Sequence, residues 1–73
     1  MGFRDWLEER YGAETVRQLD FWCRKLEELG VREYSEEEFE DYIWRNYHSF
    51  RWNRSRLRYA YRRYWEWKKY GKG

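Results

Sequence analysis

The chain has 73 residues, of which 41% are charged and 25% are aromatic. This length allows one domain with a small core, and six Trp, eight Tyr and four Phe exclude a disordered chain. The single cysteine, Cys23, excludes an internal disulfide, and no uncharged run is long enough for a membrane span or a signal peptide. We therefore expect a soluble, cytoplasmic protein that does not act at a membrane.

Charge is strongly segregated along the sequence. Residues 1–44 hold six Lys or Arg against thirteen Asp or Glu, whereas residues 45–73 hold ten Lys or Arg against Glu66 alone. The net charges of the two parts are −7 and +9, which together give the formal charge of +2. This segregation indicates an anionic partner for the C-terminal part. The alternative is that the two parts only neutralise each other across the fold.

Two helices are predicted in the acidic part. Phe3, Trp6 and Leu7 lie at helical spacing and predict a short helix over residues 3–10, which ends before Gly12. A second helix is predicted over residues 13–29, with Gly30 as its C-terminal stop. Its apolar stripe consists of Val16, Leu19, Trp22, Cys23, Leu26 and Leu29.

A capping box predicts the start of a third helix. Ser35 is its N-cap and Glu38 reaches back, while the acidic first turn suits the positive end of the helix dipole. The buried face of this helix is predicted to consist of Phe39, Tyr42, Ile43, Tyr47 and Phe50. A fourth helix is predicted to begin at Asn53, a favourable N-cap, and to end near Tyr70 before Gly71.

The sequence thus predicts an all-α fold, a single compact domain of four helices over residues 1–73. No strand alternation, hairpin signal or internal repeat is present. The predicted core consists of Trp6, Leu19, Trp22, Leu26, Phe39, Ile43, Leu57, Tyr61 and Tyr64.

The predicted fourth helix carries most of the basic charge. The two flanks of its apolar stripe hold Arg54, Arg58, Arg62 and Lys69 on one side and Arg56 and Arg63 on the other. Seven of the ten basic residues after position 44 are Arg, whose guanidinium binds phosphate in a bidentate manner. The pattern favours contact with double-stranded DNA, with Tyr and Trp rings packing on sugars. The alternative is a solvated helix whose Arg stems cover exposed rings.

Three segments together resemble the N-terminal core-binding domain of tyrosine recombinases, which include phage and archaeal integrases and Xer-type enzymes. Residues 15–30 are similar to the family's second helix, which starts with Thr and an aliphatic residue and ends in Gly. Residues 34–43 are similar to its acidic third-helix start, and residues 60–67 to its aromatic and basic last helix. Abundant Glu, Arg and Lys with few Asn and Gln resemble hyperthermophile composition and indicate an archaeon or its virus.

The resemblance implies a SAM-like orthogonal bundle that clamps DNA beside a catalytic domain. The second and fourth helices of such domains face the duplex. The DNA-binding residues expected on this basis are Arg17, Arg24, Lys25, Arg51, Arg54, Arg56, Arg58, Arg62, Arg63 and Lys69. Further expected partners are a catalytic recombinase domain or other recombinase protomers, and residues 72–73 correspond to the start of the interdomain linker.

The chain itself is not expected to be an enzyme. The family's catalytic residues belong to the separate domain, and the lone His48 has no nucleophile or carboxylate motif beside it. No phosphate-binding glycine loop or zinc-ligand spacing is present, and the acidic run 36–41 fits a solvated helix start better than a metal site. No cofactor or metal is therefore expected.

Two other functions remain open at this point. One is a small helix-turn-helix regulator that uses the fourth helix for recognition, although that helix is long for the role. The other is a helical protein-interaction adaptor that uses Trp and Tyr as anchors. DNA binding weakens steeply with salt, whereas an aromatic protein interface does not, so a salt series separates these hypotheses.

Overall fold

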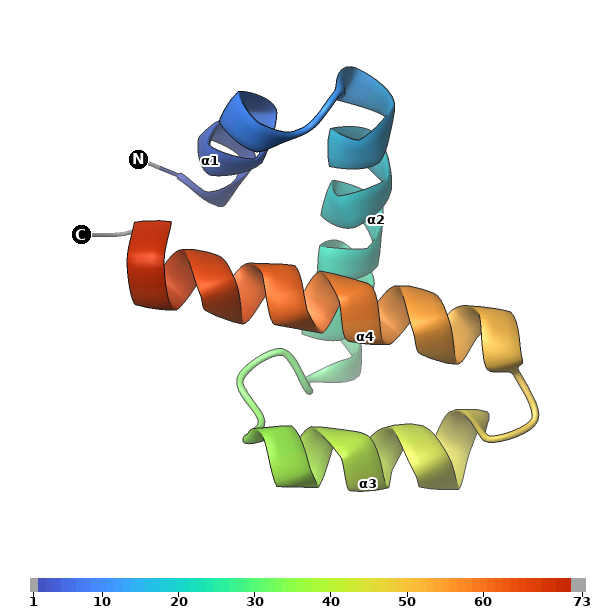
Figure 1. Ribbon diagram of the computed structural model, residues 1–73. Coiled ribbons are helices and arrows are strands. Elements are labelled where there is room, and N and C mark those ends of the chain that lie inside the picture. The colour runs from blue at the N-terminus through green and yellow to red at the C-terminus, as the bar shows by residue number, and fades with distance from the viewer. Residues whose placement is uncertain (1, 72–73) are drawn as a thin grey trace.

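The computed structural model describes residues 2–71, and in this range the chain forms four α-helices followed by one turn of π-helix (Figure 1). The helices are α1 (Phe3–Arg10), α2 (Ala13–Leu29), α3 (Glu36–Tyr47) and α4 (Arg51–Glu66), and the π-helical turn is η1 (Trp67–Gly71). The prediction of an all-α domain of four helices is confirmed. The predicted linker start at residues 72–73 lies outside the described residues.

α2 begins and ends where the sequence indicated. Gly12 precedes its first residue, and Gly30 follows its last residue in the left-handed conformation, at φ 75°. The N–H of Gly30 donates to the carbonyl of Glu27 at 3.0 Å, and the N–H of Val31 donates to that of Leu26 at 3.1 Å. Glycine adopts this backbone conformation without the steric cost of a Cβ. The turn directs Val31 into the core, where it is fully buried.

The predicted cap of α3 is confirmed. The Ser35 hydroxyl accepts a hydrogen bond from the Glu38 N–H at 3.3 Å and donates to the Glu38 carboxylate at 2.9 Å. The helix ends at Tyr47, earlier than its predicted apolar face. Phe50 was expected to be buried on that face, but its side chain is 58% exposed because the chain has already left the helix there.

The predicted start of α4 at Asn53 is wrong by two residues. α4 begins at Arg51 with Phe50 as its N-cap, and no side chain caps it. The N–H of Phe50 closes a tight turn on the carbonyl of Tyr47 at 2.9 Å, and the carbonyl of Phe50 accepts the first helical bond from Arg54. The short turn therefore forces the new helix to start before the residue with the best capping side chain.

α4 is the central element of the fold. In Figure 1 it crosses α2 at a steep angle and runs alongside α3 in the opposite direction. α1 packs against α2 and against η1. α4 thus has one side turned to the other helices and the opposite side turned to solvent.

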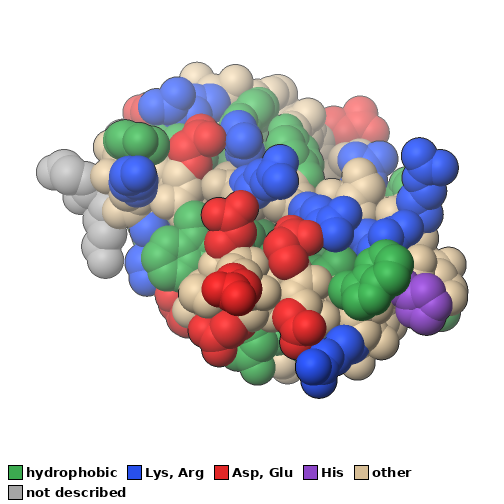
Figure 2. Space-filling model, turned by 60° about the horizontal axis from the view of Figure 1, so that its bottom comes forward, with side chains coloured by type: hydrophobic (Ala, Val, Ile, Leu, Met, Phe, Trp, Pro, Cys, Tyr) green, Lys and Arg blue, Asp and Glu red, His purple; other side chains and the backbone are tan. Residues whose placement is uncertain are grey.

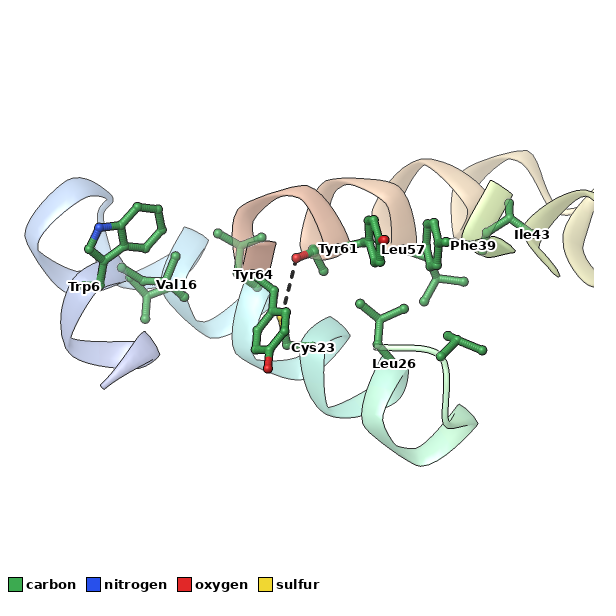
Figure 3. Packing of buried hydrophobic residues seen from close by; sticks show 13 residues of the cluster. Trp6, Val16, Cys23, Leu26, Phe39, Ile43, Leu57, Tyr61 and Tyr64 are labelled. Atoms are coloured by element: carbon green, nitrogen blue, oxygen red, sulfur yellow. Dashed lines mark hydrogen bonds between the residues drawn. The ribbon is translucent and has the colours of Figure 1, made fainter. Parts of the chain in front are cut away.

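The core forms a continuous row from Trp6 on α1 to Ile43 on α3 (Figure 3). Phe39 and Tyr61 stack toward the Ile43 end of this row with ring centroids 3.9 Å apart, and the Tyr61 hydroxyl donates to the carbonyl of Tyr34. Eight of the nine predicted core residues are buried. Trp22 is the exception, because Cys23 occupies the inward position of α2 and leaves the indole only partly buried.

The π-helical turn brings Gly71 against Trp6. A Cβ at position 71 would lie 2.6 Å from the Trp6 ring and 2.8 Å from the Trp67 ring. No side chain fits at that distance, so the glycine permits the close approach of η1 to α1. With η1, the last helix continues one turn beyond Glu66 and reaches Gly71, which the sequence predicted as its stop.

Candidate nucleic-acid interface

The solvent side of α4 carries a shallow groove lined by arginines. Its volume is about 690 Å³. The lining side chains are Arg51, Arg54, Ser55, Arg56, Arg58, Tyr59, Arg62 and Arg63. They meet there because Leu57, Ala60, Tyr61 and Tyr64 turn the opposite side of the helix into the core. The two predicted basic flanks therefore form one continuous surface.

Arg58 is held within the fold. Its Nε donates to both carboxylate oxygens of Glu40 on α3, at 2.9 and 3.1 Å, and its Nη2 lies 2.7 Å from Oε1. About a third of the Arg58 side chain is exposed. Arg58 was expected to face a phosphate freely, but its guanidinium is already paired with a carboxylate from the neighbouring helix.

Arg63 also forms bonds within the fold. Its Nη1 donates to the hydroxyl of Tyr11 at 3.1 Å and lies 3.3 Å from the carboxylate of Glu66. The hydrogen bond that it donates to Tyr11, more than the nearby carboxylate, raises the pKa of this guanidinium further above its usual range. The guanidinium also lies over the ring of Tyr59, 5.5 Å from its centroid. Arg63 therefore positions the aromatic wall of the groove.

The other four arginines of the groove have no such carboxylate partner. Among residues 2–71, no ion pair is formed by Arg51, Arg54, Arg56 or Arg62. The Nε of Arg54 is buried without a hydrogen-bond partner among the same residues. These four side chains are the uncompensated positive charge of the groove.

Acidic side chains gather on one part of the surface (Figure 2). Figure 2 shows acidic groups gathered over the start of α3 and basic groups bordering them. Glu36, Glu37 and Glu38 form the first turn of α3, which lies beside the C-terminal half of α4. The two parts of the chain therefore neutralise each other in part, since Arg58 pairs with Glu40 and Lys68 with Glu33.

Four of the expected binding residues lie outside the groove. Arg24 pairs with Asp20 at 3.2 Å on α2, and Lys25 is a half-buried residue of the same helix. Lys69 lies on η1 with its ammonium over the ring of Tyr70. Arg17 lies on α2 in a separate aromatic pocket. The structure therefore brings six of the ten expected residues together and leaves these four elsewhere.

Sequence reasoning did not identify the aromatic pocket between α2 and α4. Phe21 and Trp52 line it, and the side chain of each is 60% exposed. Trp22, which is partly buried and packs against the core, also lines it. A signal was present, because Phe21 lies off the apolar stripe of α2 and has no place in the core.

Nothing in residues 2–71 brings three His, Cys, Asp or Glu side chains close enough together to hold a metal ion. Each helix of the described range is too short or too polar to cross a bilayer. Comparison with family models, with curated proteins and with solved structures gave no match to this chain.

Proposed function

We propose that the chain is a binding domain for double-stranded DNA, with the arginine groove of α4 as its contact surface. The observation that carries the proposal is the set of four arginines in one groove, Arg51, Arg54, Arg56 and Arg62, that lack a carboxylate partner among the described residues. A charged group that the fold does not neutralise is available to an anionic ligand, and arginine is the side chain best matched to phosphate.

The groove is suited to a polyanion rather than to one small ligand. It is long and open, and it follows the helix from Arg51 to Arg63. Phosphates of a duplex recur along a backbone, so several guanidinium groups contact them at once. Ser55 and Tyr59 lie between the arginines and add hydroxyl donors that hydrogen-bond to phosphate or sugar oxygens. The acidic start of α3 repels the duplex and restricts it to the other side of α4.

We further propose that the domain acts as a DNA-clamping arm beside a catalytic recombinase domain. The support is the resemblance in residues 15–30, 34–43 and 60–67, together with the helical fold and the basic last helix. In this role the chain supplies affinity and orientation and performs no chemistry itself. Contacts to phosphate carry no sequence information, so the isolated domain binds with little sequence preference, at about 10⁻⁴ to 10⁻⁶ M at physiological salt.

The test is a gel-shift series over increasing salt with several unrelated duplexes. The variant R51A/R62A removes two exposed, unpaired groove arginines. Its affinity should fall about equally for every duplex, and its plot of log affinity against log salt should be flatter by about 0.9 for each lost phosphate contact. The matched control R4A/R45A removes the same charge from α1 and α3, where both side chains are exposed.

Two results would overturn the proposal. The first is no binding of any duplex at low salt and high protein concentration. The second is R51A/R62A losing no more affinity than R4A/R45A. If the chain binds no DNA but binds a protein partner with an affinity that hardly changes with salt, the adaptor function would be supported instead.

A further inference from the structure

A second site adjoins the groove, at the N-terminal end of α4. It is a pocket of about 350 Å³ between α2 and α4, within the range typical of small-ligand sites. Its lining residues are Arg17, Gln18, Phe21, Trp22, Trp52 and Arg56. Three aromatic rings meet here: Phe21 and Trp52 are mostly exposed, and Trp22 is partly buried against the core.

The rings hold one another in place. Trp22 and Trp52 contact edge to face with centroids 5.5 Å apart, and Phe21 and Trp22 do so at 5.1 Å. The guanidinium of Arg56 lies 5.2 Å from the centroid of the Trp52 ring and fixes that ring further. The aromatic walls are therefore formed before any ligand arrives.

The polar groups of the pocket define its ligand. Arg17 and Arg56 are both cationic, Gln18 offers an amide that donates and accepts hydrogen bonds, and no carboxylate is among the lining residues. A ligand that matches these groups is flat and aromatic, has hydrogen-bonding edges and carries negative charge on both sides. A nucleotide within a strand has all of these features.

The pocket and the arginine groove share Arg56, which lines both. A strand that leaves the groove at this residue therefore reaches the aromatic walls directly. A base inside a duplex has both faces stacked on its neighbours and does not reach these walls. Only an unpaired base does.

We propose that this pocket binds one unpaired nucleobase of a single-stranded tail or gap that adjoins a duplex. The base stacks on the indole of Trp52, the amide of Gln18 contacts its edge, and Arg17 and Arg56 contact the flanking phosphates. This inference rests on the proposed function, because it requires that the groove hold the adjoining duplex.

The inference is tested by measuring the affinity of the wild-type chain for three DNA probes. The probes are a blunt duplex, the same duplex with a short thymine tail, and the same duplex with an equally long abasic tail. The abasic tail keeps every phosphate and lacks only the bases. The thymine tail should bind about five- to 100-fold tighter than the abasic tail, as expected for stacking of one base on an aromatic ring. Equal affinity for the two tailed probes would overturn the inference, because any gain would then be electrostatic.

Variants locate the effect. Trp52→Ala should remove the preference for the thymine tail and leave binding of the blunt duplex nearly unchanged. Trp44→Ala is the matched control, since Trp44 on α3 is equally exposed, at 61%, and lies outside the pocket. Gln18→Ala, an exposed position on α2, provides a second variant that does not depend on the folding of a Trp mutant.

The outcomes separate the two proposals. Binding of the blunt duplex without preference for the thymine tail retains the proposed function and overturns only the pocket inference. Failure of all three probes overturns both. A preference that survives Trp52→Ala and Gln18→Ala would place the base elsewhere and overturn the assignment of this pocket.

Discussion

Glu40 on α3 and Arg58 on α4 form a two-pronged ion pair, with Nη2 of Arg58 2.7 Å from Oε1 of Glu40 and Nε bonded to both carboxylate oxygens. The pair joins two helices that also meet in the core, where the ring of Phe39 stacks on that of Tyr61. It also neutralises one of the six arginines of the groove. One carboxylate therefore acts both on the stability of the fold and on the charge available to DNA.

Replacement of Glu40 should consequently change stability and binding in opposite directions. Glu40→Gln removes the partner of Arg58, lowers the free energy of unfolding by about 1 kcal/mol and frees a guanidinium for phosphate. Its DNA affinity at low salt should exceed that of the wild type. Glu37→Gln is the control, because it removes the same charge from an exposed position of α3. A Glu40→Gln variant that binds no more tightly than Glu37→Gln would contradict the prediction.

Arg58 and Arg62 should separate into a stabilising and a binding residue. Arg58→Ala breaks the ion pair and lowers the melting temperature, with a loss of about 1 kcal/mol, while its effect on DNA affinity stays small. Arg62→Ala removes an exposed arginine and should do the reverse, with a stability change within about 0.5 kcal/mol. Thermal melts and gel shifts on both variants check this. Equal effects of the two substitutions on DNA affinity would show that the ion pair opens on binding.

Leu26→Ala tests the core. Leu26 is a fully buried residue of α2 (Figure 3). Its replacement by alanine should therefore lower the free energy of unfolding by about 2–5 kcal/mol. This is a large part of the stability of so small a domain. Leu29→Ala on the same helix is the control, since Leu29 is only partly buried and should cost less. Urea titration followed by circular dichroism at the helical minima gives the free energy of unfolding of both variants. A similar loss of stability for the two would contradict the packing described.

Cys23 should be unreactive in the folded state. Its Sγ donates to the carbonyl of Ala60 at 3.6 Å, and burial raises the pKa of the thiol to about 12. The thiolate, which is the reactive form, is therefore almost absent at neutral pH. A disulfide reagent should modify the native protein slowly and the unfolded protein rapidly. As a control, Ser49→Cys in a Cys23→Ala background places one thiol at an exposed position and should react rapidly without denaturant.

Glu33 should make part of the stability dependent on pH. The hydroxyl of Tyr64 donates to it at 2.7 Å, and this bond, aided by Lys68 at 3.2 Å, lowers the pKa of the carboxyl below its ordinary value of 4.5. A lowered folded-state pKa gives stability that is present above pH 4.5 and is lost as the pH falls through the folded-state value. The group is exposed, so the contribution stays below about 1 kcal/mol.

The measurement is the difference in melting temperature between wild type and Glu33→Gln. The wild type should be the more stable at pH 6, and the difference should shrink below pH 4.5. Glu9→Gln, at an exposed position of α1, should show no such trend. A difference for Glu33→Gln that stays constant between pH 6 and pH 3 would contradict the assignment.

The helices were predictable because their signals are local. Gly30 and Ser35 mark helix ends through backbone conformation and capping, which depend on a few neighbouring residues. The start of α4 was not predicted, because the turn from Tyr47 to Phe50 outweighed the capping preference of Asn53. Trp22 was placed in the core for a related reason: periodicity does not decide which of two adjacent apolar residues turns inward.

The candidate site was predictable in its chemistry and less so in its details. Helical periodicity was sufficient to place the basic residues of α4 beside its apolar stripe. It did not indicate that Glu40 pairs with Arg58, or that Trp52 packs against Trp22, because these contacts join different helices. Such pairings depend on how helices cross, which a single sequence does not encode locally.

The contact of α1 with η1 has a consequence for the order of folding. It joins the two ends of the described chain, whereas α3 and α4 are connected by a short turn and meet through nearby residues. Closing a loop costs more entropy as the loop lengthens, so we expect α3 and α4 to associate early and η1 to dock on α1 last. Because Gly71 allows the tight seating against Trp6, the step that completes the domain depends on a residue without a side chain. The same contact should open first when the protein begins to unfold.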